Sequence, residues 1–354
     1  MNASDTKLMK ALRGQPTDGV PFWEVWFGMT ALAERLLNEN SVLSPQSSVL
    51  RPAERVKDHD EFGRPTKSIE GAVRLARIMG WEHLSIWTPG HSPGAKTGTT
   101  SDGASRYVQG GKVPLEELYA RPDPDLTEAA EYLEQAKTVA REEGMATIAY
   151  VPWCFHAANT ALGLENLAYL LYDDPQYIDA LFEWIEEGTR RAIREVILPL
   201  GVDIVLFDGD CAYKNGLMVN PDLFRRLVFD RTAKTVAPLK DAGILYTFHS
   251  DGKVDDLLPV LIELGFSGFH GVESAANDLE DIKQRFGREI TLIGNMDIVF
   301  LTHASVEQVR TETEKMLATG MRAGRYIAAC NTSPLDYIPF ENYMAMVDVI
   351  KSYG

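Results

Sequence analysis

His249, Glu273 and Cys330 are the residues with the clearest capacity for chemistry, because each stands at the end of a short apolar run. Zinc binds histidine nitrogen, carboxylate oxygen and cysteine sulfur, and a catalytic zinc keeps one position open for substrate. We predict that these three residues hold a zinc ion. Asp251 is a further catalytic candidate beside His249, either as a fourth ligand or as the group that orients the imidazole. The alternative for a single histidine is an imidazole satisfied by backbone carbonyls.

Two more carboxylates, Asp208 and Asp210, flank Gly209 directly after another apolar run. Glycine allows a sharp turn, so both side chains could face the same opening. Paired carboxylates in a partly dry cleft share a proton, bind a cation or orient a ligand. We predict Asp208 as a catalytic residue and Asp210 as a substrate-binding residue. The alternative is that they cap helices and hydrogen-bond loops. His156 also follows an apolar run, but no partner spacing singles it out.

Aromatic residues recur near the same run ends, notably Trp23, Trp26, Trp153 and Phe248. Core packing is the ordinary role of each ring taken singly. Several of them together suggest a pocket that accepts a flat ring, and we predict that these four bind the substrate. Asn295 follows a later run and is added to this set, with loop hydrogen bonding as an equal alternative.

The runs that carry these residues alternate with helical patterns, which favours a parallel α/β fold. Eight apolar runs are found: Pro21–Phe27, Glu82–Trp87, Ala146–Trp153, Asp203–Phe207, Ile244–Phe248, Phe266–Val272, Ile290–Met296 and Arg325–Cys330. The helical patterns are clearest at Leu126–Glu143, Leu164–Tyr172, Ile178–Val196, Pro221–Lys240, Leu257–Leu264, Leu279–Phe286, Val306–Leu317 and Phe340–Lys351. Eight strands over this length predict a closed (β/α)₈ barrel, whose ligands bind at the carboxyl ends of the strands.

The rest of the chain adds little to this barrel. Residues 1–354 are predicted to form one domain, in which 1–80 is an N-terminal extension that begins with a short helix and includes the first strand. The segment SRYVQGGKV is predicted to be part of a hairpin insertion that turns at Gly110 and Gly111.

Composition limits the classes of function. With 45% hydrophobic and 24% charged residues, the 354-residue chain is typical of a folded globular protein. A formal charge of −16 and the absence of a basic cluster argue against nucleic acid as a partner. No stretch is apolar enough to predict a signal peptide or a membrane span, so we expect a cytoplasmic protein. The three cysteines are far apart and are expected to be reduced thiols.

Five stretches between residue 146 and the last residue resemble the uroporphyrinogen decarboxylase superfamily, which includes the cobalamin-dependent methyltransferases. They are LGLENLAYLLYDDPQYIDALFEWI, GVDIVLFDGDCAYKNGLMVNPDLF, LKDAGILYTFHSDGKVDDLLPVLIELG, IKQRFGREITLIGNMD and CNTSPLDYIPFENYMAM. The resemblance implies a (β/α)₈ barrel with its site at the C-terminal face, in agreement with the count of apolar runs.

The resemblance also separates two branches of the superfamily. Decarboxylases carry an arginine-rich N-terminal stretch that clamps a polycarboxylate substrate, whereas the segment Pro21–Gly28 has no arginine and contains Glu24. Methyltransferases bind zinc through a His-x-Cys pair and a later cysteine, and here Asp251 occupies the place of the first cysteine. A site richer in oxygen is a harder Lewis acid, suited to an ether oxygen. The chain is therefore most similar to the corrinoid-linked O-demethylases.

The function implied is a zinc-dependent transfer of a methyl group from a methoxylated, aromatic substrate to the Co(I) corrinoid of a partner protein. Asp208 and Asp210 would orient that substrate. One alternative is a methyltransferase that uses a methylthiol, methylamine or methylcorrinoid donor. Another is a lyase like uroporphyrinogen decarboxylase, and a third is a corrinoid-binding barrel without chemistry of its own.

Overall fold

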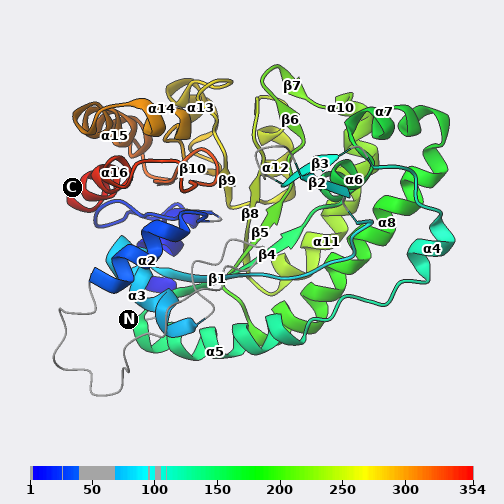
Figure 1. Ribbon diagram of the computed structural model, residues 1–354, viewed down its shortest axis with the longest axis horizontal. Helices are drawn as coiled ribbons and strands as arrows, with labels where there is room; N and C mark the ends of the chain where they lie inside the picture. The colour runs from blue at the N-terminus through cyan, green and yellow to red at the C-terminus, as the bar shows by residue number, and fades with distance from the viewer. Residues whose placement is uncertain are drawn as a thin grey trace. The chain divides into compact units, whose positions relative to one another are not determined.

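The computed structural model describes residues 3–25, 27–39, 68–94, 96–99, 105–108 and 110–353 (Figure 1). Its contacts divide the chain into two compact units. The first unit contains Met1–Ile86, Glu134–Ile148 and Ser267–Gly354, and the second contains Trp87–Leu133 and Ala149–Phe266. Among the described residues, seven strands form the parallel sheet. The strands β1 (His83–Trp87) and β4 (Ala146–Pro152) and the helix α5 (Thr127–Glu143) contain residues of both units.

In the second unit, β5 (Ile204–Asp208) pairs in parallel with β8 (Leu245–His249) and has β4 on its other side. Both strands are buried at four of their five residues, and β5 is apolar up to its last residue, as expected for parallel strands covered on both faces. Their register sets Asp208 beside His249. The two residues that end these strands are therefore neighbours.

Helices follow these strands in the second unit, and α8 packs against α11 beside the sheet (Figure 1). The helices are α4 (Leu115–Tyr119), α6 (Cys154–Leu162), α7 (Leu164–Asp173), α8 (Pro175–Ala192), α9 (Leu198–Leu200), α10 (Pro221–Phe224), α11 (Asp230–Asp241) and α12 (Leu258–Leu264). The π-helical segments η3 (Ile193–Ile197) and η4 (Arg225–Phe229) make α8 to α9 and α10 to α11 continuous. Prolines in the first turns of α8 and α10 follow the side-chain caps Asp174 and Asn220.

Two small hairpins complete the second unit. One joins β2 (Lys96–Thr99) to β3 (Ser105–Val108) and the other joins β6 (Ala212–Tyr213) to β7 (Gly216–Leu217), both antiparallel. The predicted hairpin insertion is present. The predicted turn at Gly110 and Gly111 is wrong, because both glycines follow β3 and do not lie between the two strands of the hairpin. The cause is that SRYV forms the second strand of the hairpin and not the first.

In the first unit, β10 (Thr291–Ile293) lies between β9 (Gly268–His270) and β11 (Tyr326–Ile327), and all three are parallel. The 3-10 segment η1 (Ala3–Asp5) precedes the helices of this unit. These are α1 (Lys7–Leu12), α2 (Thr30–Glu39), α3 (Ile69–Met79), α13 (Leu279–Phe286), α14 (Ile298–His303), α15 (Val306–Gly320) and α16 (Phe340–Ser352). Asp278, Asp297 and Ser305 begin α13, α14 and α15 with side-chain caps. No helix in the part of the chain that the structure describes has the length and apolar character needed to cross a membrane.

The predicted α/β class is confirmed, and seven of the eight apolar runs form the parallel strands. The described residues of the first run, Pro21–Phe27, make a single parallel bridge, between Phe22 and Ala328. The amide of Trp23 also donates to the carbonyl of Ala328 at 3.1 Å. This segment therefore runs beside the chain after β11 without forming a regular strand, and closure of an eight-stranded barrel stays a prediction.

Glu24 holds this N-terminal segment in the core of the first unit. Its carboxylate accepts the backbone N–H of Cys330 at 3.1 and 3.2 Å and the hydroxyl of Tyr343 at 3.0 Å. Burial raises the pKa of Glu24 to about 7, although these hydrogen bonds act in the opposite direction. The expected acidic residue of the Pro21–Gly28 segment is thus a buried structural group.

Replacing Glu24 with glutamine tests this burial through the pH dependence of stability. The folded chain keeps the proton up to a pH of about 7, whereas the unfolded chain loses it above about 4.5. The free energy of unfolding of the wild type therefore falls as pH rises through this window, by about 3 kcal/mol. In Glu24→Gln this fall is absent. The difference in unfolding free energy between the variant and the wild type, measured by urea titration, should therefore shift by about 3 kcal/mol in favour of the variant from the low to the high end of this pH window.

Glu341→Gln is the matched control, because this glutamate is exposed and 3.8 Å from Arg35 at the surface. Its stability is expected to follow that of the wild type within about 0.5 kcal/mol at every pH. Parallel pH profiles for Glu24→Gln and the wild type would contradict the assignment of Glu24 as a buried acid.

Candidate metal centre

Three side chains of the second unit converge where β5 and β8 end. Asp210, His249 and Asp251 each offer a ligand atom, and these atoms all lie within 4.8 Å of one another. His249 Nε2 is 3.5 Å from Asp210 Oδ1. The imidazole is buried and the two carboxylates are half-buried. One imidazole nitrogen and two carboxylate oxygens are a donor set that zinc accepts, so these residues fit the metal predicted for His249.

The turn after β5 fixes Asp210 through close packing. The amide of Gly209 donates to the carbonyl of His249 at 3.2 Å, which extends the pairing of the two strands by one residue. A β-carbon at Gly209 would collide with the ring of Trp153. Asp210 Oδ1 then accepts the amide of Asp251 at 3.0 Å. Glycine is therefore required here by the approach of the indole.

The turn after β8 fixes Asp251 in a similar way. Ser250 is completely buried, and its hydroxyl accepts the amide of Cys211 at 3.1 Å and donates to the carbonyl of Asp251 at 2.8 Å. Gly252 has φ +91°, and a β-carbon there would lie 2.5 Å from the backbone nitrogen of Tyr213. The sequence Ser250-Asp251-Gly252 is thus a turn clamped against the chain that follows Asp210.

Asp208 and His156 complete the polar surroundings of the three residues. Burial is the main cause that raises the pKa of Asp208, and the neighbouring Asp210 adds to it, while His156 and His249 act against it. His156 Nδ1 accepts the amide of Asp210 at 3.2 Å and lies 3.9 Å from its Oδ2. The interaction with an N–H requires a free lone pair on Nδ1, which places the proton of a neutral imidazole on Nε2. The only sequence signal for His156 was its position after an apolar run.

The predicted ligand set His249, Glu273 and Cys330 is divided between the two units, since Glu273 and Cys330 belong to the first. Cys330 is completely buried, and burial together with Glu24 raises the pKa of its thiol well above the ordinary value. The structure thus brings His249 together with Asp251 and Asp210, and the set of three remote ligands stays a prediction.

The predicted ring-binding residues lie in apolar cores. Trp153 and Phe248 are completely buried and meet edge to face with ring centroids 4.7 Å apart, and the indole N–H of Trp153 donates to Thr232 at 2.8 Å. Trp23 is equally buried in the first unit, where its ring meets the edge of His83. Core packing accounts for these three rings, and their contact with a substrate stays a prediction. Trp26 lies outside the described residues.

Comparison with known families identifies the chain's relatives. Residues 113–353 match the family model described as uroporphyrinogen decarboxylase (URO-D). The chain belongs to the uroporphyrinogen decarboxylase family. The match includes all the residues of the candidate metal centre and begins after the segment that contains Glu24. No curated protein gives a significant match.

Solved structures support the fold of this family member. A methyltransferase from Methanosarcina mazei is similar with a TM-score of 0.68 and 18% identity, over 99% of each chain. A B12-independent methionine synthase from Shewanella sp. W3-18-1, in complex with selenomethionine, is similar with a TM-score of 0.50 and 15% identity, over 80% of this chain and 86% of that one. At these identities the similarity establishes the fold, and the predicted superfamily is confirmed. The predicted corrinoid-linked branch stays a prediction.

The turn at Gly252 yields a test with an internal control. Gly252→Ala meets both a left-handed backbone and a backbone atom at 2.5 Å, whereas Gly243 has φ +72° with nothing within 4 Å of its β-position. We expect Gly243→Ala to lower the free energy of unfolding by about 1 kcal/mol and Gly252→Ala by at least about 3 kcal/mol. Urea denaturation measures both losses of unfolding free energy, provided that the variants have the same m-value as the wild type. Equal losses would show that the contact with Tyr213 does not constrain the turn.

Proposed function

We propose that this chain is a zinc-dependent methyltransferase that moves a methyl group from a methoxylated aromatic substrate to the Co(I) corrinoid of a partner protein. Its family and its similarity to methyltransferase folds support a methyltransferase. The observation that carries the proposal is the convergence of Asp210, His249 and Asp251 within 4.8 Å. Parallel α/β enzymes bind their ligands at this end of the strands.

The donor set favours an oxygen substrate. Two carboxylates and one imidazole form a harder site than the thiolate-rich sites that activate thiols. A bound zinc would supply Lewis acidity toward the oxygen that loses its methyl group. Asp210, His249 and Asp251 would hold the ion, and the hydrogen bond from the amide of Asp251 to Asp210 fixes the two carboxylates relative to each other.

Asp208 is suited to handle a proton beside this site. Burial raises the pKa of this carboxyl, and its oxygens could form a hydrogen bond with a ring hydroxyl of the substrate. The position of Asp208 opposite His249 in the strand register directs it to the same end of the sheet. We therefore keep Asp208 as a catalytic candidate and add His156 as the group that positions Asp210.

Metal content and turnover test the proposal together. Purified wild-type protein is expected to hold about one zinc per chain by elemental analysis, and His249→Ala or Asp251→Asn to lower zinc affinity by at least about 100-fold. Demethylation of methoxyarenes in the presence of a Co(I) corrinoid protein should fall with metal content. Asp241→Asn, an exposed carboxylate at the end of α11, is the control that keeps both.

Variants of other residues separate the competing interpretations. Full zinc content in Asp210→Asn would contradict the proposed metal centre. Loss of zinc in Cys330→Ala as complete as in His249→Ala would instead support the set of remote ligands. Turnover of methyl thioethers but not of methoxyarenes would identify a different methyl donor. Release of CO₂ from a porphyrinogen would identify a lyase. Corrinoid binding that survives His249→Ala, without turnover, would identify a binding protein.

A further inference from the structure

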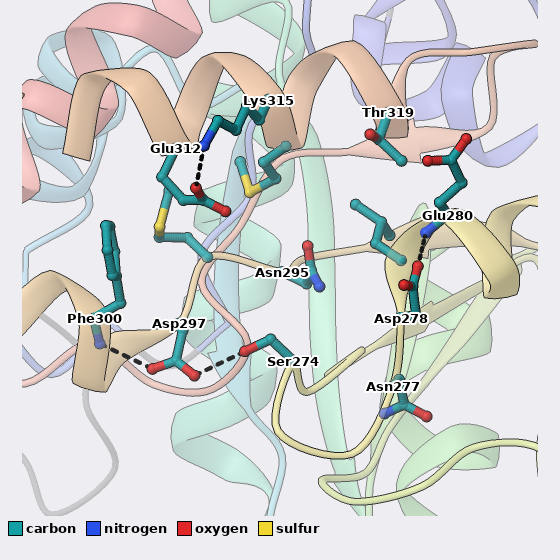
Figure 2. Close-up of a pocket in the computed structure, with 13 residues that line it drawn as sticks. Ser274, Asn277, Asp278, Glu280, Asn295, Asp297, Phe300, Glu312, Lys315 and Thr319 are labelled. Atoms are coloured by element: carbon teal, nitrogen blue, oxygen red, sulfur yellow. Dashed lines mark hydrogen bonds and ion pairs between the residues drawn. The ribbon is translucent and has the colours of Figure 1, made fainter. Parts of the chain in front are cut away.

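A groove of about 440 Å³ opens in the first unit at the ends of β9 and β10, beneath one face of α15 (Figure 2). Its walls come from the loops that carry Ser274 and Asn295, the first turns of α13 and α14, and the residues Glu312 and Lys315 of α15. All of these elements belong to the first unit, so the groove is complete within it. The residues of the candidate metal centre belong to the second unit.

Asn295 presents an acceptor to this groove. The residue is only 9% exposed, and its Nδ2 donates to the carbonyl of Val272 at 3.0 Å. Of the two polar atoms of the asparagine side chain, only Nδ2 can donate to a carbonyl, so this bond fixes which atom faces Val272. Oδ1 then points toward the groove, as Figure 2 shows. Within the described part of the chain, no group donates to this Oδ1. A ligand with an N–H or O–H donor would give Oδ1 a partner, as the carbonyl of Val272 does for Nδ2.

The charges around the groove are predominantly negative. Four carboxylates line it, those of Asp278, Glu280, Asp297 and Glu312, against the ammonium group of Lys315. Glu280 is neutralised by Arg322 at 2.5 Å, and Glu312 lies 3.4 Å from Lys315. Asp278 and Asp297 have no cationic partner among these groups, and each accepts two amides at the start of a helix. The field at the groove therefore favours a cation.

The remaining lining selects an organic cation over a metal ion. Met296, Phe300 and Met316 contribute apolar surface beside Asn295, which suits a short hydrocarbon body. Among the described residues, no three acidic, histidine or cysteine side chains of this groove come within 4.8 Å of one another, the spacing that a metal ion would require. The acceptor of Asn295 needs a donor, which a quaternary ammonium lacks.

From these features we propose that the groove binds a small primary amine or guanidine. The ligand's N–H groups donate to Asn295 Oδ1 and its positive charge is attracted by Asp297 and Asp278, while its alkyl chain lies against Met296 and Met316. No bond is made or broken in this site. The proposal does not depend on the function proposed above.

Agmatine and putrescine are suitable probes, titrated into the full-length protein by calorimetry. The wild type is expected to bind at least one of them with 1:1 stoichiometry and a dissociation constant below about 1 mM. Choline, which has no N–H donor, should bind at least about tenfold more weakly. Absence of saturable binding of both amines, or equal binding of choline, would overturn the proposal.

Two lining variants and one control locate the site. Asn295→Leu should weaken binding by at least about tenfold, and Glu312→Gln by about threefold to tenfold. Glu314→Gln carries the same charge change on the same helix at an exposed position outside the groove, and should bind within about twofold of the wild type. If Asn295→Leu does not fold, the contrast between Glu312→Gln and Glu314→Gln decides, and equal weakening in these two variants would show general charge attraction instead of a site.

Discussion

The parallel pairing of β5 with β8 is the constraint on which the candidate metal centre depends. Its register sets Asp208 beside His249. The pairing continues one residue beyond β5, since the amide of Gly209 donates to the carbonyl of His249. A slip of one residue would turn the imidazole to the opposite face of its strand. Burial of the apolar residues Ile204–Phe207 prevents that slip, so the packing of the core determines the chemistry at its edge.

Periodicity predicted most of the elements because it reflects burial directly. Seven of eight apolar runs form strands and each predicted helix is present, with boundaries that differ by a few residues. The composition of the first run does not distinguish it from a strand. In the structure, however, the amide of Cys330 donates to the carboxylate of Glu24 and not to a backbone carbonyl, as it would between two paired strands. The turn of the β2–β3 hairpin was misplaced because glycines signal turns without saying which two segments pair.

The residues of the candidate metal centre could all be named from the sequence, but only His249 and Asp251 could be grouped. Asp210 was predicted in a separate, substrate-binding role, because no spacing rule relates a residue after one strand to residues after the next. Their convergence depends on strand register and on two turns, at Gly209 and Gly252, whose constraints come from Trp153 and Tyr213. Cys330 illustrates the converse, since its position at a strand end said nothing of the buried glutamate beside it.

Carboxylates at the ends of parallel strands have an ordinary structural use, and the two units differ in how far that use explains them. In the first unit, Asp278 and Asp297 each accept amides at the start of a helix, so capping accounts for their positions. It does not account for Asn295, whose acceptor faces the groove. In the second unit, Asn220 and Leu257 occupy the cap positions of α10 and α12, and neither Asp208 nor Asp251 precedes a helix directly. Loop hydrogen bonding explains one oxygen of Asp210. Asp210 and Asp251, with ligand atoms within 4.8 Å of each other and of His249, repel each other at a cost that capping does not offset, which is the physical reason to look there for a cation.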